Sequence, residues 1–229
     1  MLQQINKKRI YFYIFTFLIL STLFNQKLII LFKNNFLLKH ISIEIGDLEV
    51  EKKIKSSSNY LLNKNIFFVS KERIENNLNS LKFLENVNVK KKYPSTIIID
   101  AKKTELLAAT YLNQKKYFIG SNGNFILSNK ISNYSNLPLI FGKFNINSYL
   151  NLRDELAKNG YDNDKIVKYF FHKNKRWDLI YKNNTIIKLP NKNLANALKL
   201  LNNFKKKNTI EPNSIIDLRI HKRLTIKNG

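Results

Sequence analysis

The chain of 229 residues contains no cysteine, only six glycines and only three histidines. The absence of cysteine excludes disulfide bonds, thiolate zinc sites and cysteine nucleophiles, and it leaves the redox compartment open. So few glycines leave little room for a tight loop that cradles a ligand, and the sequence shows no phosphate-binding loop, serine nucleophile elbow or zinc spacing. The sequence therefore predicts a protein that is not an enzyme and that carries no metal and no cofactor.

The titratable residues are scattered. The three histidines stand in different predicted elements, and no two of them have the spacing of a helical metal pair. Asp162 and Asp164 are close in sequence, as are Glu44 and Asp47, but these are loop positions among lysines. We interpret the four carboxylates as solvated surface groups.

Positive charge dominates the composition, with 40 lysines and arginines against 16 acidic residues and a formal net charge of +24. Such an excess first suggests a nucleic-acid or anionic-membrane partner. The basic residues, however, are spread from Lys7 to Lys227 without a basic helix or stripe, and they accompany a matching enrichment in Asn and Ile. The codon usage of an AT-rich genome explains this joint enrichment, so we expect a solvated surface and no nucleic-acid partner.

Residues Ile10 to Phe24 form an apolar and aromatic run that directly follows three basic residues at positions 7–9. As a helix this run spans only about 22 Å, whereas the hydrocarbon core of a bilayer measures about 30 Å. A second apolar run, Leu28 to Phe32, completes the span. The sequence predicts a cytoplasmic tail over residues 1–9, a single transmembrane helix over residues 10–32, and the bulk of the chain on the other side of the membrane.

Two other interpretations compete for this segment. A cleaved signal peptide has an apolar region of similar length, but no small-x-small cleavage pattern follows Phe24. A buried core helix is disfavoured because the run has no polar face. An uncleaved membrane anchor is the preferred prediction.

Residues 38–105 predict a small domain with the element order β-α-α-β-β. Alternating isoleucines over residues 41–45 indicate a half-buried strand, and helical spacing follows from Val50 to Leu62. Ser70 is placed to begin a second helix, and Tyr93-Pro94-Ser95 separates the two strands of a hairpin. Two helices can cover one face of a sheet of three strands.

Residues 106–229 predict a mixed β-sheet domain with flanking helices, so the overall fold class is α+β. The expected elements are a hairpin over 117–127, a helix over 148–159, a meander of strands over 166–171, 176–181 and 185–189, a helix opened by Pro190 and Asn191, and a terminal strand, or two strands, over 216–226.

Several short motifs carry a family resemblance. Leu84 to Val89 and Tyr93 to Thr96 are typical of POTRA domains. The second half contains Leu137–Gly142, Arg176–Leu179, Ile187–Pro190 and Ile216–Arg219 in order. On these residues the chain resembles the FtsQ/DivIB cell-division proteins over nearly its whole length. It departs from them around Lys102 to Leu106, which replace an acidic residue and a proline, and in a very short tail after Ile226.

The resemblance implies a scaffold of the bacterial division machinery in the inner membrane, concentrated at the division septum. It implies that the last strands receive FtsB of the FtsB–FtsL pair, that the POTRA domain and membrane helix contact other division proteins, and that there is no small-molecule substrate.

Independently of the resemblance, a terminal strand that no later strand covers offers unpaired N–H and C=O groups to an added strand. Trp177 is expected in the core, and Asp217 and Arg219 are expected on one face of a strand. Arg176 is a weaker candidate, on a strand expected beside the site. The candidate partner-binding residues are Arg219, Ile220, Lys222, Leu224, Ile226 and Arg176.

Three other functions remain open at this point. They are a POTRA-containing assembly or secretion module that handles unfolded clients, a membrane-tethered nucleic-acid binder and a cell-wall hydrolase. No barrel sequence follows the predicted POTRA domain, which disfavours the first, and a visible catalytic set is missing for the last.

Overall fold

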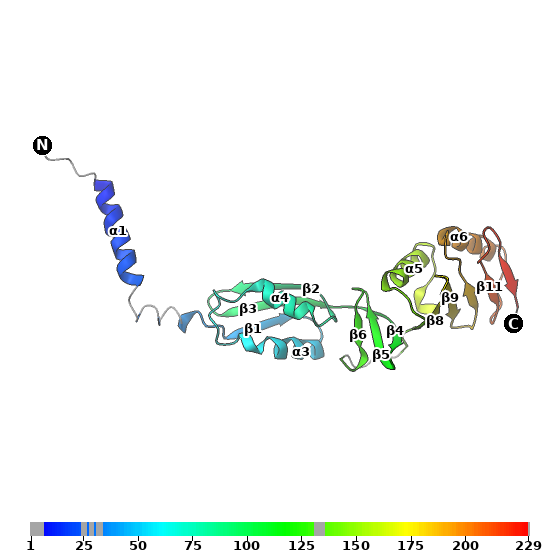
Figure 1. Cartoon of the computed structure of the whole chain (residues 1–229), viewed down its shortest axis with the longest axis horizontal. Coiled ribbons are helices and arrows are strands. Elements are labelled where there is room, and N and C mark those ends of the chain that lie inside the picture. Colours follow the sequence, from blue (N-terminus) through cyan, green and yellow to red (C-terminus); the bar gives the residue numbers. More distant parts are fainter. Residues whose placement is uncertain (1–6, 24–26, 28–29, 31–33, 131–135, 229) are drawn as a thin grey trace. The chain divides into compact units, whose positions relative to one another are not determined.

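A computed structural model of the protein describes residues 7–23, 27, 30, 34–130 and 136–228. The chain divides into two compact units, Met1–Lys103 and Thr104–Gly229. Figure 1 shows the helices and strands of each unit. The division lies two residues before the boundary expected from the sequence, after residue 105.

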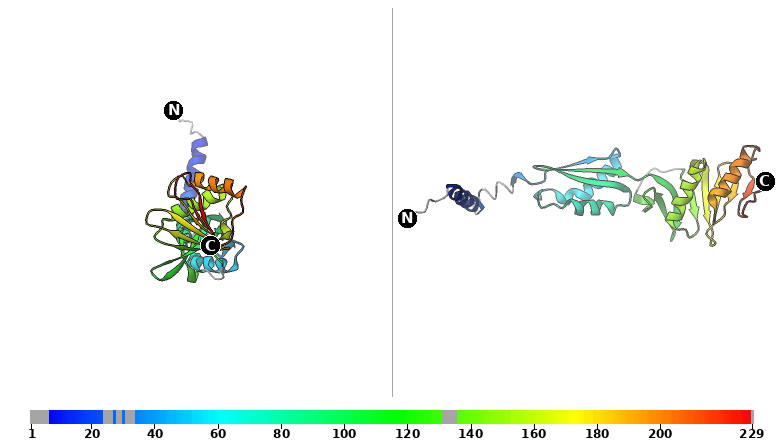
Figure 2. Two further views of the ribbon diagram at one scale, coloured as in Figure 1. Left: turned by 90° about the vertical axis from the view of Figure 1, so that its right-hand side faces the viewer. Right: turned by 90° about the horizontal axis from the view of Figure 1, so that it is seen from above.

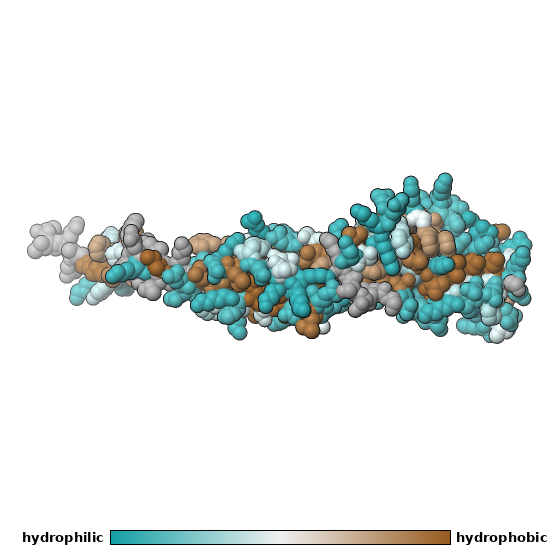
Figure 3. All heavy atoms as spheres, turned by 90° about the horizontal axis from the view of Figure 1, so that it is seen from below, coloured by the Kyte–Doolittle hydropathy of each residue, from teal (hydrophilic) through white to brown (hydrophobic). Residues whose placement is uncertain are grey.

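The first helix, α1 (Lys7–Leu23), begins with three basic residues and has no polar face from Ile10 onward. Its aromatic side chains, including Tyr11, Phe12 and Phe17, are exposed, and hydrophobic atoms lie on its surface in Figure 3. The hydroxyl of Thr16 donates to the Phe12 carbonyl at 2.8 Å, so that this polar group is satisfied within the helix. Among the described residues, no helix has both the length and the apolar character of a membrane span. Most of the expected transmembrane segment beyond residue 23 lies outside the described residues.

The rest of the first unit is the predicted β-α-α-β-β arrangement. Its elements are β1 (His40–Glu44), α3 (Leu48–Ser58), a 3-10 helix (Asn59–Leu61), α4 (Lys71–Asn79), β2 (Leu84–Lys92) and β3 (Thr96–Lys103). The three-stranded sheet has the order β1-β3-β2, with β1 parallel and β2 antiparallel to β3. The POTRA-like topology predicted from the sequence is confirmed.

Capping side chains begin both helices of this unit. Asp47 Oδ1 accepts hydrogen bonds from the backbone N–H groups of Glu49 and Val50, at 3.0 and 3.1 Å, which begins α3. Asp47 Oδ2 also lies 2.6 Å from Lys103 Nζ, so the start of α3 is joined to the end of β3. Ser70 Oγ accepts from Arg73 N at 3.3 Å and begins α4 at the predicted residue.

The second unit contains nine strands and two α-helices among its described residues. They are β4 (Leu106–Leu112), β5 (Lys115–Gly120), β6 (Phe125–Leu127), β7 (Leu139–Phe141), α5 (Ile146–Lys158), β8 (Ile166–Phe171), β9 (Trp177–Tyr181), β10 (Ile186–Lys188), α6 (Leu194–Lys205), β11 (Ile215–Asp217) and β12 (Thr225–Lys227), with 3-10 turns at Ser128–Lys130 and Asn163–Lys165.

These strands form one mixed sheet in the order β12-β11-β10-β9-β8-β7-β4-β5-β6. The pairs β10–β11, β4–β7 and β7–β8 are parallel, and the other pairs are antiparallel. The predicted β5–β6 hairpin and the predicted β8-β9-β10 meander are confirmed. Strand β4 was not predicted, because its Ala108-Ala109-Thr110 segment gives only a weak alternating signal.

One face of this sheet carries the core of the unit. A cross-strand row of side chains runs in register from β7 to β11, and each is buried: Ile140, Tyr169, Leu179, Ile187 and Ile216. Leucines of α5 and α6 pack in the same cluster, and Figure 2 shows both helices over one face of the strands. Trp177 is buried in this core, as predicted, and its Nε1 donates to Ser148 Oγ at 3.2 Å.

Candidate partner-binding site

The site begins with β12, which forms one edge of the nine-stranded sheet. It pairs with β11 in antiparallel register, with Ile226 opposite Ile216. On its other side no strand of the described chain is paired with it. An edge of this kind is a template for strand addition.

The direction of the backbone groups in β11 follows from its bonds to β10. Leu218 N donates to the Lys188 carbonyl at 3.0 Å, and the Ser214 carbonyl accepts from Ile186 N at 2.9 Å. Because the N–H and C=O of successive residues in a strand point to alternate sides, those of Ile216 also face β10. The pair Ile216 and Ile226 is therefore a non-hydrogen-bonded pair of the β11–β12 ladder.

It follows that the N–H and C=O of Ile226 point away from β11, toward the open edge. The side chain of Ile226 is half-buried, and it packs with that of Leu224 against the core cluster. Thr225 and Lys227 are exposed. An added strand would therefore meet an outward backbone donor and acceptor at a residue whose own side chain is held by the core.

Four predicted site residues lie outside the strands: Arg219, Ile220 and Lys222 are on a loop, and Leu224 directly precedes β12. The alternation of Ile216, Leu218 and Ile220 suggested a longer strand, but β11 ends at Asp217 and Ile220 is 60 % exposed. Lys222 has a left-handed φ of 58° within this loop. The prediction that Arg219, Ile220 and Lys222 belong to the edge strand was therefore wrong.

The strand ends because Asp217 turns the chain back on itself. Asp217 Oδ1 accepts a hydrogen bond from Arg219 N at 3.0 Å, and Arg219 Nε lies 2.8 Å from both carboxylate oxygens. A side chain that bonds a backbone N–H two residues later competes with the sheet ladder. The Arg219 guanidinium also holds the pKa of Asp217 below its ordinary value.

The loop and helix α6 enclose a groove of about 420 Å³. Its charged lining residues are all basic: Lys192, Lys199, Arg219, Lys222 and Arg223. Asp217 offsets the charge of Arg219, so the positive charge of the groove comes mainly from Lys192 and Lys199 on the side of α6 and from Lys222 and Arg223 on the side of the loop. The loop residues were predicted from the sequence, whereas the contribution of α6 was not, although the sequence carried a signal for it. Asn196, Lys199 and Asn203 have the spacing of one helix face, and all three line the groove.

Arg176 precedes β9, which is separated from β12 by β10 and β11. The prediction that its strand adjoins the edge was therefore wrong. The register of the sheet nevertheless places Arg176 at the same end of the sheet as Arg219, because Asp178, Lys188 and Asp217 stand opposite one another on β9, β10 and β11. Arg176 Nε donates to Asn174 Oδ1 at 3.1 Å.

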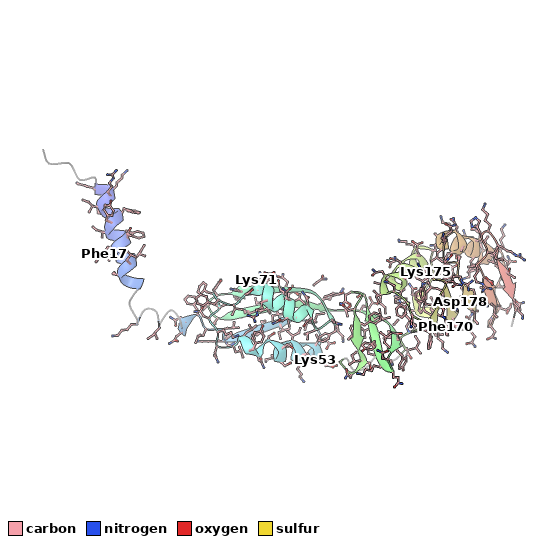
Figure 4. The ribbon with its side chains drawn as sticks, in the orientation of Figure 1. Phe17, Lys53, Lys71, Phe170, Lys175 and Asp178 are labelled. Atoms are coloured by element: carbon pink, nitrogen blue, oxygen red, sulfur yellow. The ribbon has the colours of Figure 1, made fainter. Side chains whose placement is uncertain are left out.

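The sheet face opposite the helices carries a row of alternating charge beside the site. Lys188 stands between Asp178 and Asp217 in register, and Asp178 Oδ2 lies 2.9 Å from His172 Nε2. Phe170 stands opposite Asp178 on β8 (Figure 4). Opposite charges on neighbouring strands stabilise a sheet by about 0.2–1 kcal/mol per pair. We interpret this row as support for the strands that carry the site.

Both units match families of known proteins. Residues 36–102 match the FtsQ-type POTRA domain, and residues 109–219 match the C-terminal domain of cell division protein FtsQ/DivIB. The chain is similar to cell division protein FtsQ of Rickettsia bellii (strain RML369-C), with 30% identity over 176 residues that cover 76% of this chain and 65% of that protein.

It is also similar to cell division protein FtsQ of Rickettsia typhi (strain ATCC VR-144 / Wilmington), with 28% identity over 183 residues, or 78% of this chain and 66% of that protein. With the same protein of Rhizobium meliloti (strain 1021) it shares 25% identity over 152 residues, or 66% of this chain and 49% of that protein. The chain thus spans about half to two thirds of the length of these curated relatives.

Proposed function

The chain belongs to the FtsQ/DivIB family of cell-division proteins, and we propose that it is a non-catalytic scaffold that captures FtsB, of the FtsB–FtsL pair, by strand addition at β12. The observation that carries this proposal is the open edge of β12, where Ile226 directs its N–H and C=O away from β11. An added strand satisfies these groups, while contacts with alternate side chains provide selectivity.

The basic groove beside this edge supports a partner that carries acidic residues next to its pairing segment. Lys192, Lys199, Lys222 and Arg223 line the groove, and no acidic residue is among the residues that line it. Charge complementarity at the rim of an interface acts mainly on the rate of encounter and on the choice of partner. The edge of β12 thus provides backbone pairing with the partner, and the basic groove provides selection among partners by charge. Arg176, at the same end of the sheet, contributes to the same positive field.

The proposal includes an anchor in the bacterial inner membrane. The apolar surface of α1, the three basic residues before Ile10 and the apolar run Leu28 to Phe32 support a single span with a cytoplasmic N-terminus. In this arrangement both units lie outside the cytoplasm, and the scaffold concentrates at the division septum. The first unit and the anchor are then available to other division proteins.

A pair of substitutions at one position tests strand addition. Ile226→Pro removes the outward N–H, which makes no hydrogen bond to β11, whereas Ile226→Ala keeps the N–H and removes a similar part of the side chain. We expect the affinity of the purified full chain for FtsB, measured by biolayer interferometry, to fall at least about tenfold further for the proline variant than for the alanine variant.

Thermal unfolding followed by Trp177 fluorescence provides the control for folding. An equal loss of affinity in the two variants, with both folded, would show that side-chain contact and not backbone pairing holds the partner. Unchanged binding of both variants would move the site away from β12.

A further inference from the structure

The three-stranded sheet of the first unit has two chemically different ends. At one end, which we call the proximal end, His40 of β1 lies opposite Thr96 of β3, and the chain enters the sheet there after α1. At the other, distal end, Glu44 lies opposite Asp100, and Lys103 leads into the second unit.

Aromatic side chains gather at the proximal end. The ring of Phe67 stacks on that of Tyr93 at a centroid distance of 5.0 Å, and the ring of Phe36 packs on Phe67 in a tilted arrangement at 4.8 Å. Lys91, near the end of β2, donates from Nζ to the Phe67 carbonyl at 3.3 Å, which places these three rings at the proximal end. Beside it, Phe68 is 89 % exposed. A phenylalanine ring so far removed from the core has no role in the packing of the unit.

The balance of charge differs between the two ends of the first unit. The acidic residues at the distal end are Glu44, Asp47, Glu49, Glu51, Glu85 and Asp100, at the ends of β1 and β3 and the starts of α3 and β2. Three of them, Asp47, Glu49 and Glu85, form ion pairs with Lys103, Lys53 and Lys102 at the same end. The proximal end carries Lys39, Lys64, Lys71, Lys91 and Lys92, with Glu72 beside them at the start of α4. The proximal end is therefore both basic and aromatic.

A basic hollow adjoins the exposed ring. Its volume is about 430 Å³, and Lys64, Asn65, Ser70 and Arg73 provide its polar lining, with Phe68 at its side. No acidic residue is among those that line it. Lysine and arginine beside hydroxyl and amide groups are suited to an anionic phosphate group.

We propose that the proximal end of the first unit rests on an anionic lipid surface, with Phe68 inserted among the headgroups and the surrounding lysines paired with lipid phosphates. Aromatic rings favour the membrane–water interface, and each lysine or arginine near an anionic surface adds about 1 kcal/mol of attraction. A protruding ring surrounded by flexible cations fits a fluid surface better than a protein partner, which would offer a matched pocket.

The short segment between α1 and the proximal end also favours a lipid surface as the partner. This step rests on the proposed membrane anchor. Leu23, the last residue of α1, and Phe36 are thirteen residues apart, which limits their separation to about 45 Å. The anchor thus holds the proximal end near the membrane at a high effective concentration, so that weak contacts with the lipid are sufficient. The inference goes beyond the division scaffold, because it assigns a second binding surface outside the second unit.

The test uses the full chain inserted in lipid vesicles. Because the chain has no cysteine, single cysteines can be placed by Phe68→Cys at the proximal end and by Leu48→Cys at the distal end, where Leu48 is 78 % exposed. Each cysteine is labelled with the fluorophore NBD, and its quenching by a nitroxide on the lipid headgroup is measured. The vesicles contain phosphatidylcholine alone or phosphatidylcholine mixed with phosphatidylglycerol.

We expect at least about threefold stronger quenching at position 68 than at position 48 in the anionic vesicles, and a loss of this difference in phosphatidylcholine alone or at about 1 M salt. Adding Lys64→Gln and Arg73→Gln to the chain labelled at position 68 should reduce its quenching.

Flotation in a density gradient separates the two proposals. A chain that floats with the vesicles but is quenched equally at both positions would overturn the lipid-surface inference and leave the anchor intact. A chain that stays at the bottom of the gradient would overturn both.

Discussion

Arg219 closes on the carboxylate of Asp217, two residues before it, with Nε at 2.8 Å from both carboxylate oxygens and the backbone N–H at 3.0 Å from Oδ1. This contact lies at the end of β11, where the chain enters the loop beside α6 that leads to β12. The contact therefore stands between the two parts of the proposed site, the groove and the edge.

Asp217→Asn should weaken the second unit in a pH-dependent way. The pKa of Asp217 is lowered by its hydrogen bonds to Arg219, so ionised Asp217 stabilises the fold above its unfolded pKa of about 4, and this stabilisation is lost as the pH falls through the lower folded pKa. Because the pair is partly exposed, we expect a loss of at most about 1 kcal/mol at neutral pH.

Urea unfolding followed by Trp177 fluorescence at several pH values measures this difference. Asp164→Asn, in an exposed turn, is the control and should change little. A difference between the wild type and Asp217→Asn that persists unchanged well below pH ~4 would contradict the assignment.

Asp47 and Lys103 should behave as a coupled pair in the first unit. Asp47→Ala removes the helix cap of α3 and the contact with Lys103, and we expect a loss of about 1–2 kcal/mol. Lys103→Ala removes only the second contact and should cost less. Hydrogen exchange of the α3 amides measures the loss of stability in each variant. If the double variant lost as much as the two single losses added together, the two residues would be independent.

Gly142→Ala should be far more damaging than Gly160→Ala. Gly142 has a φ of 101°, and a Cβ there would collide with the backbone carbonyl of Phe171 at the end of β8. Gly160 has a φ of 77°, but a Cβ there would meet no atom within 4 Å. We expect a loss of about 1 kcal/mol for Gly160→Ala, from backbone strain alone, and at least about 3 kcal/mol for Gly142→Ala. Equal melting temperatures of the two variants would show that β8 moves freely.

Lys199→Glu should slow the capture of the division partner without changing its release. Lys199 lines the basic groove on α6, where it acts through long-range attraction. We expect the association rate for FtsB to fall about three- to tenfold at low salt, with a smaller effect at high salt and a nearly unchanged dissociation rate. Lys115→Glu, at the start of β5 and far along the sheet order from β12, is the control. A change confined to the dissociation rate would instead indicate direct contact.

The elements of the first unit were predictable because their signals are local. The alternation over residues 41–45, the helical spacing from Val50 to Leu62 and the cap at Ser70 act within a few residues, and β1, α3 and α4 lie where these signals place them. In the second unit, the meander of β8, β9 and β10 was also predictable, since short turns join its antiparallel strands. The end of β11 was not, because the alternation of Ile216, Leu218 and Ile220 continues past it.

The sequence by itself determined the two-part organisation, the type of most elements and the membership in the family, since periodicity, capping and motif order are properties of neighbouring residues. Only the tertiary structure decided the order of the strands in the sheet, which helix stood beside the loop, and how far Arg176 lay from β12. These outcomes depend on pairings between distant segments, such as the parallel contacts of Ile187 with Ile216 and of Thr110 with Ile140. Local patterns specify that a residue is buried in a strand, but the free energy of packing the whole sheet selects its neighbour.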